Sequence, residues 1–513
     1  MSFKNNPLLM TDGYKVAHHK MYAPGTTKVY SNFTCRSTKR MQPNAQDIVV
    51  FGTQYVFKYI QELWEENFFN QPKEQVCSEA KQYLSSYLSS EYDVSHFEAL
   101  HDLGYLPIKV KSLEEGTIIK EGIPLFTIIN THNDFFWVTN FLETLISTLI
   151  WKPVHSASLA LAYKRLLTKY ALETGEDNIG FVDFQAHDFS FRGMQSPEAA
   201  LASGLGFASV FKGSDTIPIL KAITHFYNDD NSVFSVPATE HSVMCSGSKE
   251  GEINTFKRLL ETFPTGILSV VSDTWDLWKV LTEYIPQLKE DILARDGKLV
   301  VRPDSGDPVD IICGLKDVKE DNEENAGFGG LYVWDKNRPG EYIPKYVSES
   351  EAKGVIELLW DTFGGTINEQ GYKVLDSHIG AIYGDSITLE RAEEICKRLK
   401  AKGFASTNIV FGVGSYSMGY ATRDNQGGAV KSTYVEINDN GFEIFKDPIT
   451  DDGTKKSAKG LLKVYSENGF IKLKDQITLE EENTGLLKTI FENGKLISEN
   501  SLSKIREKIN NNL

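Results

Sequence analysis

The densest group of reactive side chains is the segment Arg302-Pro303-Asp304-Ser305-Gly306-Asp307, which directly follows the apolar run 299–301. An arginine beside two aspartates in one turn suits a site that holds an anion together with a hydroxylated sugar or Mg²⁺. Proline, aspartate, serine and glycine also form turns for purely local reasons, so an ordinary turn is the alternative. We favour a functional turn because other polar clusters follow neighbouring apolar runs in the same way.

A second candidate is Thr239-Glu240-His241-Ser242, which follows the apolar run 233–236. A single histidine is often only a hydrogen-bonded structural residue. At the end of a strand, however, Asp273 and Asp276 could orient its imidazole. In that setting His241 could transfer a proton or accept a phosphoryl group.

Glycine-rich turns provide candidate phosphate sites. Gly384-Asp385 and Gly412-Val413-Gly414-Ser415 follow two consecutive apolar runs, and their backbone N–H groups could hold a phosphate, although ordinary turns explain many such glycines. Asp385 could bind a ribose diol, and it could also favour the N-terminus of the helix expected over 389–399. Phe189 or Phe191 could stack on a flat heterocycle or simply fill the core.

These clusters require elements that bring them to one place. Seven short apolar runs each end in a polar tail, and helical patterns separate them. The runs are 181–184, 207–211, 233–236, 267–271, 299–301, 379–383 and 409–411. Repeated strand, polar tail and helix predict a parallel α/β barrel with the site at its mouth. A helix is expected to begin at Ser156.

The predicted organisation has three parts. Residues 1–155 form a mixed α+β region, 156–422 form the barrel domain, and 423–513 return to strands and lysine-rich loops that complete the first region as one discontinuous domain. Residues 317–351 interrupt the barrel pattern with 9 acids against 4 bases, which indicates a surface insertion.

Composition excludes several classes of protein. The 513 residues are 41% hydrophobic and carry a net charge of -16, so the chain is globular and unsuited to long polyanions or anionic membranes. Five scattered cysteines without a C-x-x-C pair favour reduced thiols. We expect a soluble cytoplasmic protein, because the apolar stretch 135–151 is too short and too polar to span a bilayer.

The motifs taken together resemble the nicotinamide phosphoribosyltransferase family, a type II phosphoribosyltransferase family. They occur in the family's order along nearly the whole chain. The matching motifs are Thr11-Asp12-Gly13-Tyr14-Lys15, Phe33-Thr34-Cys35-Arg36, His187-Asp188-Phe189 to Gly193, Lys212 to Thr216, Ser235 to Ser242, Val271-Ser272-Asp273, Arg302 to Gly306, Gly384-Asp385, Thr422-Arg423-Asp424 and Phe445 to Pro448.

This resemblance implies that nicotinamide reacts with 5-phosphoribosyl 1-diphosphate to give nicotinamide mononucleotide and diphosphate in NAD salvage. It implies an irregular, incomplete α/β barrel plus a mixed α+β domain built from both ends of the chain. A homodimer with shared active sites is expected, with Mg²⁺ as cofactor and ATP as an activating co-substrate that phosphorylates His241.

Residue roles follow from the same resemblance. Phe189 and Tyr14 of the partner subunit would sandwich the nicotinamide ring, while Asp215 accepts a hydrogen bond from the carboxamide NH₂ and disfavours nicotinate. Arg192 and Arg302 would bind phosphate oxygens, with Arg302 also near the carboxamide oxygen. The catalytic set is His241, Asp304, Arg302, Asp273 and Asp276.

Further contacts are implied for the sugar and its phosphates. Asp304 and Asp385 would hold ribose hydroxyls and the Mg²⁺ environment, and N–H groups near Gly384, Gly414 and Ser415 would hold the 5-phosphate. The remaining substrate-binding residues are Ser272, Arg36, Arg423, Lys431, Lys446 and Lys455.

The sequence departs from the family pattern at three places, and three rival functions remain open. Arg often stands where Gly380 is, Ser where Ala429 is, and most of 317–351 is absent in the family. The rivals are a nicotinate phosphoribosyltransferase, a barrel sugar-phosphate aldolase or isomerase, for which Lys212 is the nearest Schiff-base candidate, and a binding protein for phosphorylated metabolites. Asp361 to Thr366 resembles a diphosphate loop of another fold, but we expect a helix before it.

Overall fold

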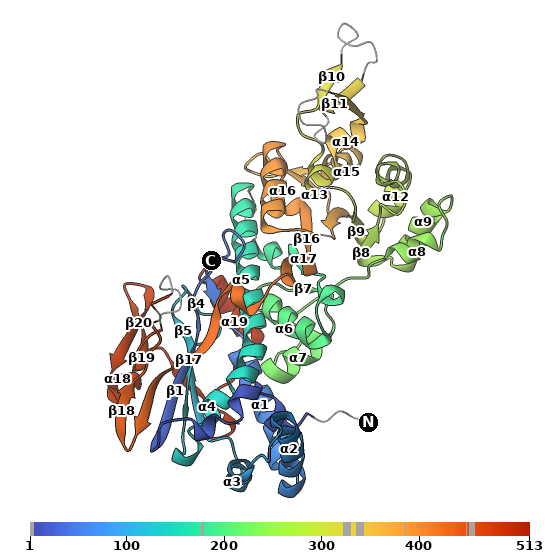
Figure 1. Ribbon diagram of the computed structural model, residues 1–513. Coiled ribbons are helices and arrows are strands. Elements are labelled where there is room, and N and C mark those ends of the chain that lie inside the picture. Colours follow the sequence, from blue (N-terminus) through green and yellow to red (C-terminus); the bar gives the residue numbers. More distant parts are fainter. Residues whose placement is uncertain are drawn as a thin grey trace.

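The computed structural model describes residues 5–175, 179–321, 330–334, 343–384, 386–447, 449–450 and 457–513. Its centre is a sheet of six parallel strands in the order β7-β6-β16-β15-β9-β8 (Figure 1). The strands are β6 (Ala186–Asp188), β7 (Gly213–Ser214), β8 (Thr265–Val271), β9 (Asp296–Arg302), β15 (Ile379–Tyr383) and β16 (Ile409–Val413). Parallel strands covered on both faces are apolar throughout, as in the fully buried β15.

An extended segment over 233–238 links the two edges of this sheet. Phe234 bridges to Gly213 on β7, and Ala238 bridges to Ser269 on β8. The Ser214 N–H donates to the Phe234 carbonyl at 3.1 Å, and the Thr239 N–H donates to the Ser269 carbonyl at 3.0 Å. The sheet therefore curls into an incomplete barrel, which confirms the predicted fold class.

The helical patterns between the strands are largely confirmed. The barrel helices are α6 (Pro197–Ala208), α7 (Pro218–Tyr227), α8 (His241–Cys245), α9 (Glu252–Thr262), α10 (Leu277–Lys279), α11 (Ile285–Gln287), α12 (Lys289–Leu293), α13 (Pro308–Cys313), α14 (Glu349–Lys353), α15 (Val355–Phe363), α16 (Leu389–Ala401) and α17 (Ser415–Met418). As predicted, α15 precedes the Gly364-Gly365 turn, so this turn does not follow a strand.

Three of the predicted strands are wrong. Residues 181–184 lie in the 3-10 helix Ile179–Phe184, and the strand follows at Ala186. Residues 207–211 include the end of α6, whose residues from Ala202 to Ala208 are all buried. A helix buried on every side is apolar all round, so its pattern cannot be told from a buried strand. Residues 233–236 form only the bridge described above.

A second sheet combines both ends of the chain. Its order is β18-β17-β1-β5-β3-β21-β22, and neighbouring strands are antiparallel. The strands are β1 (Thr26–Cys35), β3 (Ile108–Ser112), β5 (Pro124–Asn130), β17 (Gly428–Ile437), β18 (Asn440–Glu443), β21 (Lys488–Glu492) and β22 (Lys495–Leu496). The mixed domain of N- and C-terminal segments is thus confirmed as part of the fold.

Helices and a hairpin surround this sheet. The helices are α1 (Thr53–Trp64), α2 (Lys73–Leu88), α3 (Ser95–Leu103), α4 (Val138–Phe141), α18 (Leu479–Glu482) and α19 (Leu502–Asn510). The smaller strands near it are β2 (Ile48–Val49), β4 (Ile118–Ile119), β19 (Leu461–Glu467) and β20 (Phe470–Ile477), whereas the pair β13 (Gly365–Ile367) and β14 (Lys373–Leu375) lies beside α15 of the barrel. One hydrophobic core runs through both domains.

The long helix α5 (Glu143–Glu173) runs between the two domains (Figure 1). It contacts β17 of the mixed domain and α16 of the barrel. It begins at Glu143 rather than at the predicted Ser156, and the predicted boundary at 155/156 falls inside it. The reason is that Pro153 interrupts the sequence pattern without ending the helix.

The described strands of the acidic segment 317–351 project from the barrel end of the molecule (Figure 1). Its described part contains the antiparallel strands β10 (Lys319–Asp321), β11 (Gly330–Trp334) and β12 (Pro344–Val347). The five cysteines are free thiols, as expected. Within the described ranges, no helix combines the length and the apolar character needed to cross a membrane.

Candidate active site

Four strand ends of the barrel bring the predicted catalytic turn together with an aromatic ring. Arg302 ends β9, and its Nη2 lies 3.3 Å from Asp304 Oδ2, while its guanidinium lies 5.7 Å from the centre of the Phe189 ring after β6. A side chain at Gly384, after β15, would meet Asp304 Oδ1 at 2.2 Å. One at Gly412 on β16 would meet the Phe189 ring at 2.6 Å. Both glycines are therefore needed for close approach.

The carboxylate of Asp273 connects this turn to His241. Asp273 Oδ2 accepts hydrogen bonds from the Asp304 N–H at 2.8 Å and from Ser305 Oγ at 2.5 Å. Its Oδ1 lies 4.0 Å from His241 Nε2, and the imidazole Nδ1 lies 3.2 Å from Thr274 Oγ1. Asp273 therefore lies within ion-pair distance of the half-exposed imidazole, and the hydrogen bond of the ring is to Thr274.

Asp276 and Ser272 take other positions than those expected. Asp276 accepts the Lys279 N–H at 3.1 Å and so caps α10 instead of facing His241. Ser272 is fully buried, and its hydroxyl donates to the Val270 carbonyl at 2.7 Å. Both side chains therefore bind the local backbone. Asp276 does not contact the imidazole of His241, and the Ser272 hydroxyl is buried.

Asp215 follows β7 and is held by two neighbours. His187 Nε2 on β6 lies 2.8 Å from Asp215 Oδ1, and Ser235 Oγ donates to the same oxygen at 2.5 Å. Burial raises the pKa of Asp215, but these hydrogen bonds and the charges of His187 and Arg302 outweigh burial, and the net pKa is lowered. Asp215 is thus an ionised acceptor, and its Oδ2 makes no hydrogen bond within the described part of the chain.

A cavity of about 670 Å³ opens inside the barrel beside Asp215. Its volume lies in the usual range for small-molecule sites. Apolar side chains dominate its wall, and the polar groups near Asp215 include His187 and Ser235. Sequence reasoning missed these two residues as site members, although both stand in motifs of the resemblance. His187 lies two positions before Phe189, and strand periodicity would have indicated the shared face.

The predicted phosphate turns also lie at this rim. A side chain at Gly193 would meet Ser415 Oγ at 2.0 Å, so Ser415 lies against the segment that carries the exposed Arg192. Gly414 caps α17. Asp385 and Lys455 lie outside the described residues.

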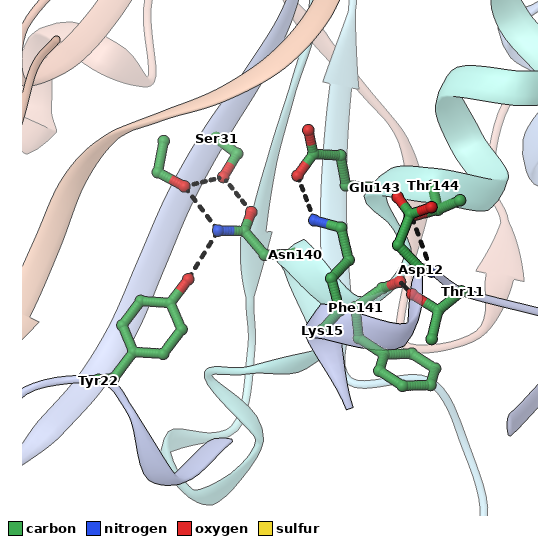
Figure 2. A network of polar contacts seen from close by, with 10 residues as sticks. Thr11, Asp12, Lys15, Tyr22, Ser31, Asn140, Phe141, Glu143 and Thr144 are labelled. Carbon is green, nitrogen blue, oxygen red and sulfur yellow. Dashed lines mark hydrogen bonds and ion pairs between the residues drawn. The ribbon is translucent and has the colours of Figure 1, made fainter. Parts of the chain in front are cut away.

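Tyr14 belongs to a segment that is fixed to the mixed domain on both sides of it, and Figure 2 shows the contacts of Thr11, Asp12 and Lys15 that fix it. Thr11 Oγ1 donates to the Phe141 carbonyl at 2.9 Å, and Thr144 Oγ1 donates to Asp12 Oδ2 at 2.7 Å. Lys15, only 4% exposed in its side chain, pairs with Glu143 at 2.5 Å. Tyr14 between them is 65% exposed and does not line the barrel cavity of its own chain.

Basic side chains gather near Tyr14 rather than at the cavity. Burial lowers the pKa of Lys431 on β17, Glu143 raises it, and the charges of Arg36, Lys446 and Lys15 lower it further. The charge of Arg423 reaches Tyr14 and lowers its pKa, which burial and nearby acids raise overall. Six described basic residues predicted to bind anions are therefore split between two places. Arg192 and Arg302 lie at the barrel rim, and the second group contains Arg36, Arg423, Lys431 and Lys446.

The alternative of a Schiff-base aldolase receives no support from this geometry. Lys212 pairs with Asp183 at 2.8 Å, and its side chain is not in an apolar pocket, so it lacks the desolvation that a Schiff-base lysine needs. Among the described residues, no cluster of three or more histidine, cysteine or acidic side chains could hold a metal. Asp304 Oδ1 and Asp273 Oδ1 are nevertheless buried and have no hydrogen-bond partner in the part of the chain that the structure describes.

Comparisons with known proteins agree with the geometry. Residues 184–495 match the model of the nicotinate phosphoribosyltransferase (NAPRTase) family, and residues 6–110 match the nicotinamide phosphoribosyltransferase N-terminal domain. Nicotinamide phosphoribosyltransferase of Acinetobacter baylyi is 47% identical over 99% of this chain and 98% of its own. The Mycoplasma pneumoniae protein of the same name is 36% identical over 89% of this chain and 97% of its own.

Solved structures support the fold. Nicotinate-nucleotide pyrophosphorylase from Pyrococcus furiosus superposes with a TM-score of 0.55 at 16% identity, covering 100% of this chain and 97% of that one. Human nicotinic acid phosphoribosyltransferase gives a TM-score of 0.51 at 16% identity, covering 98% and 93%.

Proposed function

Because the chain belongs to the nicotinate phosphoribosyltransferase family and carries the N-terminal domain of its nicotinamide phosphoribosyltransferases, we propose that it joins nicotinamide to 5-phosphoribosyl 1-diphosphate. The products are nicotinamide mononucleotide and diphosphate, a salvage step towards NAD. The enzyme is a pentosyltransferase. The observation that carries the choice of base is the ionised Asp215, held at the barrel cavity by His187 and Ser235.

Asp215 selects the amide over the acid. Its carboxylate accepts a hydrogen bond from the carboxamide NH₂, whereas the carboxylate of nicotinate would meet a like charge. Phe189 beside the cavity offers a ring face to the pyridine.

Arg302 and Asp304 handle the phosphoribosyl group. As the bond between ribose C1 and the diphosphate breaks, negative charge grows on the departing oxygens, and a placed guanidinium stabilises it. The buried Oδ1 atoms of Asp304 and Asp273, which accept no hydrogen bond from the described residues, fit a hard cation that shares its remaining ligands with phosphates. Mg²⁺, when bound there, would neutralise diphosphate charge.

We expect a homodimer in which Tyr14 of one subunit reaches the barrel of the other. This expectation is supported by an exposed Tyr14 on a fixed base and by basic residues gathered beside it, away from the cavity of their own chain. In the dimer, Arg36, Arg423, Lys431 and Lys446 would add positive charge at the partner's phosphates. The free thiols suit a reducing compartment such as the cytoplasm.

ATP is proposed to stimulate the reaction by phosphorylating His241. Replacement by alanine, His241→Ala, should abolish the ATP stimulation, because it removes the half-exposed imidazole that would accept the phosphoryl group. The measurement is the initial rate of mononucleotide formation with and without ATP. Persisting stimulation in the variant would assign the ATP effect to another residue.

The proposed function is tested with purified protein, 5-phosphoribosyl 1-diphosphate and either nicotinamide or nicotinate, with Mg²⁺ present. Nicotinamide mononucleotide and diphosphate should form in equal amounts, and nicotinate should be a poor substrate. Exclusive use of nicotinate would make this a nicotinate phosphoribosyltransferase and would refute the role of Asp215.

A further inference from the structure

Three oxygen atoms from three separate segments meet inside the molecule, behind the predicted phosphate turns. The hydroxyl of Tyr163 on α5 donates to the Ile387 carbonyl at 2.7 Å, and Ser417 Oγ on α17 donates to the same carbonyl at 2.9 Å. The two hydroxyl oxygens lie 3.2 Å apart. Tyr163 is fully buried. This contact therefore ties the turn after β15 to the turn after β16, with α5 as the common support.

The turn after β15 is held in an unfavourable backbone conformation. Ser386 has a φ of 51°, in the left-handed region that costs energy for a residue with a side chain. Arg391 Nη1 on α16 donates to its carbonyl at 2.6 Å. Such strain persists only where neighbouring contacts fix the backbone. Here these contacts include Arg391 at Ser386 and the hydroxyls of Tyr163 and Ser417 at Ile387.

Helix α5 also holds the C-terminal end of α17. Lys152 Nζ, buried on α5, donates to the carbonyl of Met418, the last residue of α17. α17 is thus fixed by α5 at Ser417 and at Met418. Its first residue, Ser415, faces Gly193 at the rim. A shift of α5 would therefore move Ser415 and the turn after β15 together.

We propose that Tyr163 is a positioning residue for phosphoribosyl transfer, which joins the two turns that would hold the ribose 5-phosphate into one rigid unit. The inference rests on the proposed function, because it takes these turns as the donor's binding site. Tyr163 touches no substrate. It acts through Ile387 and Ser417, and its loss should weaken binding of 5-phosphoribosyl 1-diphosphate without affecting the nicotinamide pocket around Asp215.

The test is Tyr163→Phe, which removes only the hydroxyl group. Donor binding is measured by calorimetry without nicotinamide, and KM values for both substrates are measured in turnover. We expect the donor Kd and KM to rise about three- to tenfold, as for one lost hydrogen bond. The nicotinamide KM should stay within about twofold. Ser417→Ala should have a similar effect, and the double variant should add little to either single change.

Tyr30→Phe is the matched control, because Tyr30 is also a buried tyrosine whose hydroxyl is hydrogen-bonded, at 3.4 Å from the Leu462 N–H in the mixed domain. It should lower the melting temperature without changing donor affinity. An unchanged donor Kd in both Tyr163→Phe and Ser417→Ala would overturn the inference. A wild-type protein that binds the donor but forms no mononucleotide would refute the proposed function but not the inference. The donor Kd of Tyr163→Phe relative to that of wild type would still decide the role of Tyr163.

Discussion

Exchange of Arg302 for glutamine is expected to lower kcat/KM for mononucleotide formation by about a thousandfold, the upper range for loss of one charge-stabilising donor in an active site. Arg302 ends a barrel strand, its Nη2 lies 3.3 Å from Asp304, and its buried Nε has no hydrogen-bond partner within the structure. This guanidinium is therefore fixed and has donor capacity left for diphosphate oxygens. Glutamine keeps a donor but loses the charge that the transition state requires.

The effect should appear mainly in kcat, because the charge on the departing diphosphate grows only as the bond breaks. Arg302→Lys should be intermediate, since lysine keeps the charge but loses the planar fork. Initial rates over a range of donor concentrations separate the two parameters. A glutamine variant within about tenfold of wild type would remove Arg302 from the catalytic set.

A matched control lies at the other end of the same strand. Arg295 directly precedes β9 and donates to the Phe263 carbonyl at 2.6 Å and to the Gly266 carbonyl at 3.2 Å. It is buried and lies away from the rim. Arg295→Gln should therefore lower the melting temperature while leaving kcat unchanged. A similar loss of kcat in both variants would indicate damage to the strand rather than loss of the catalytic charge.

Local pattern was sufficient to predict the elements whose burial differs between faces or whose ends carry clear signals. α16 combines a capping Thr388 with an apolar stripe, and its predicted range 389–399 lies within Leu389–Ala401. β15 is a short apolar run bounded by polar residues. The prediction of a strand over 207–211 was wrong because α6 is buried on all sides. Such burial removes the periodicity that distinguishes a helix from a strand.

The turn of Arg302 and Asp304 could be predicted because its chemistry lies within a few residues. The contact of His187 with Asp215 could not, because it depends on the register between β6 and β7. The triangle of Tyr163, Ile387 and Ser417 is even less accessible, since these residues are more than 200 positions apart along the chain at the extremes. Pairings across strands and helices are set by packing, not by local sequence.

The net charge of -16 describes the whole chain rather than the site. The 317–351 segment holds 9 acids against 4 bases, and its described strands lie at the end of the barrel away from the mixed domain (Figure 1). Near Tyr14, by contrast, the positive charges of Lys15, Arg36 and Lys446 reach Lys431 and help to lower its pKa. The opposite sign of these two regions is consistent with a phosphorylated substrate bound by an acidic protein.

The second large effect is expected for Asp215→Asn. This variant should lower the ratio of kcat/KM for nicotinamide to kcat/KM for nicotinate by about a hundredfold. Hydrogen bonds to charged groups contribute roughly 1.5–3 kcal/mol, which corresponds to about ten- to 150-fold. Asparagine has one acceptor oxygen. If that oxygen stays with His187 and Ser235, the amide NH₂ faces the NH₂ of the substrate, and if the side chain flips, it faces the His187 N–H.

The variant also removes the like charge that disfavours nicotinate, so the loss for nicotinamide and the gain for nicotinate act in the same direction. Because the pKa of Asp215 is lowered, its carboxylate stays ionised above about pH 5. Wild-type selectivity should therefore be constant from about pH 5 to 8, apart from changes in donor binding. Ser235→Ala, which removes one hydrogen bond but keeps the charge, should retain the preference for nicotinamide. Equal selectivity in wild type and Asp215→Asn would show that the cavity chooses its base by some other contact.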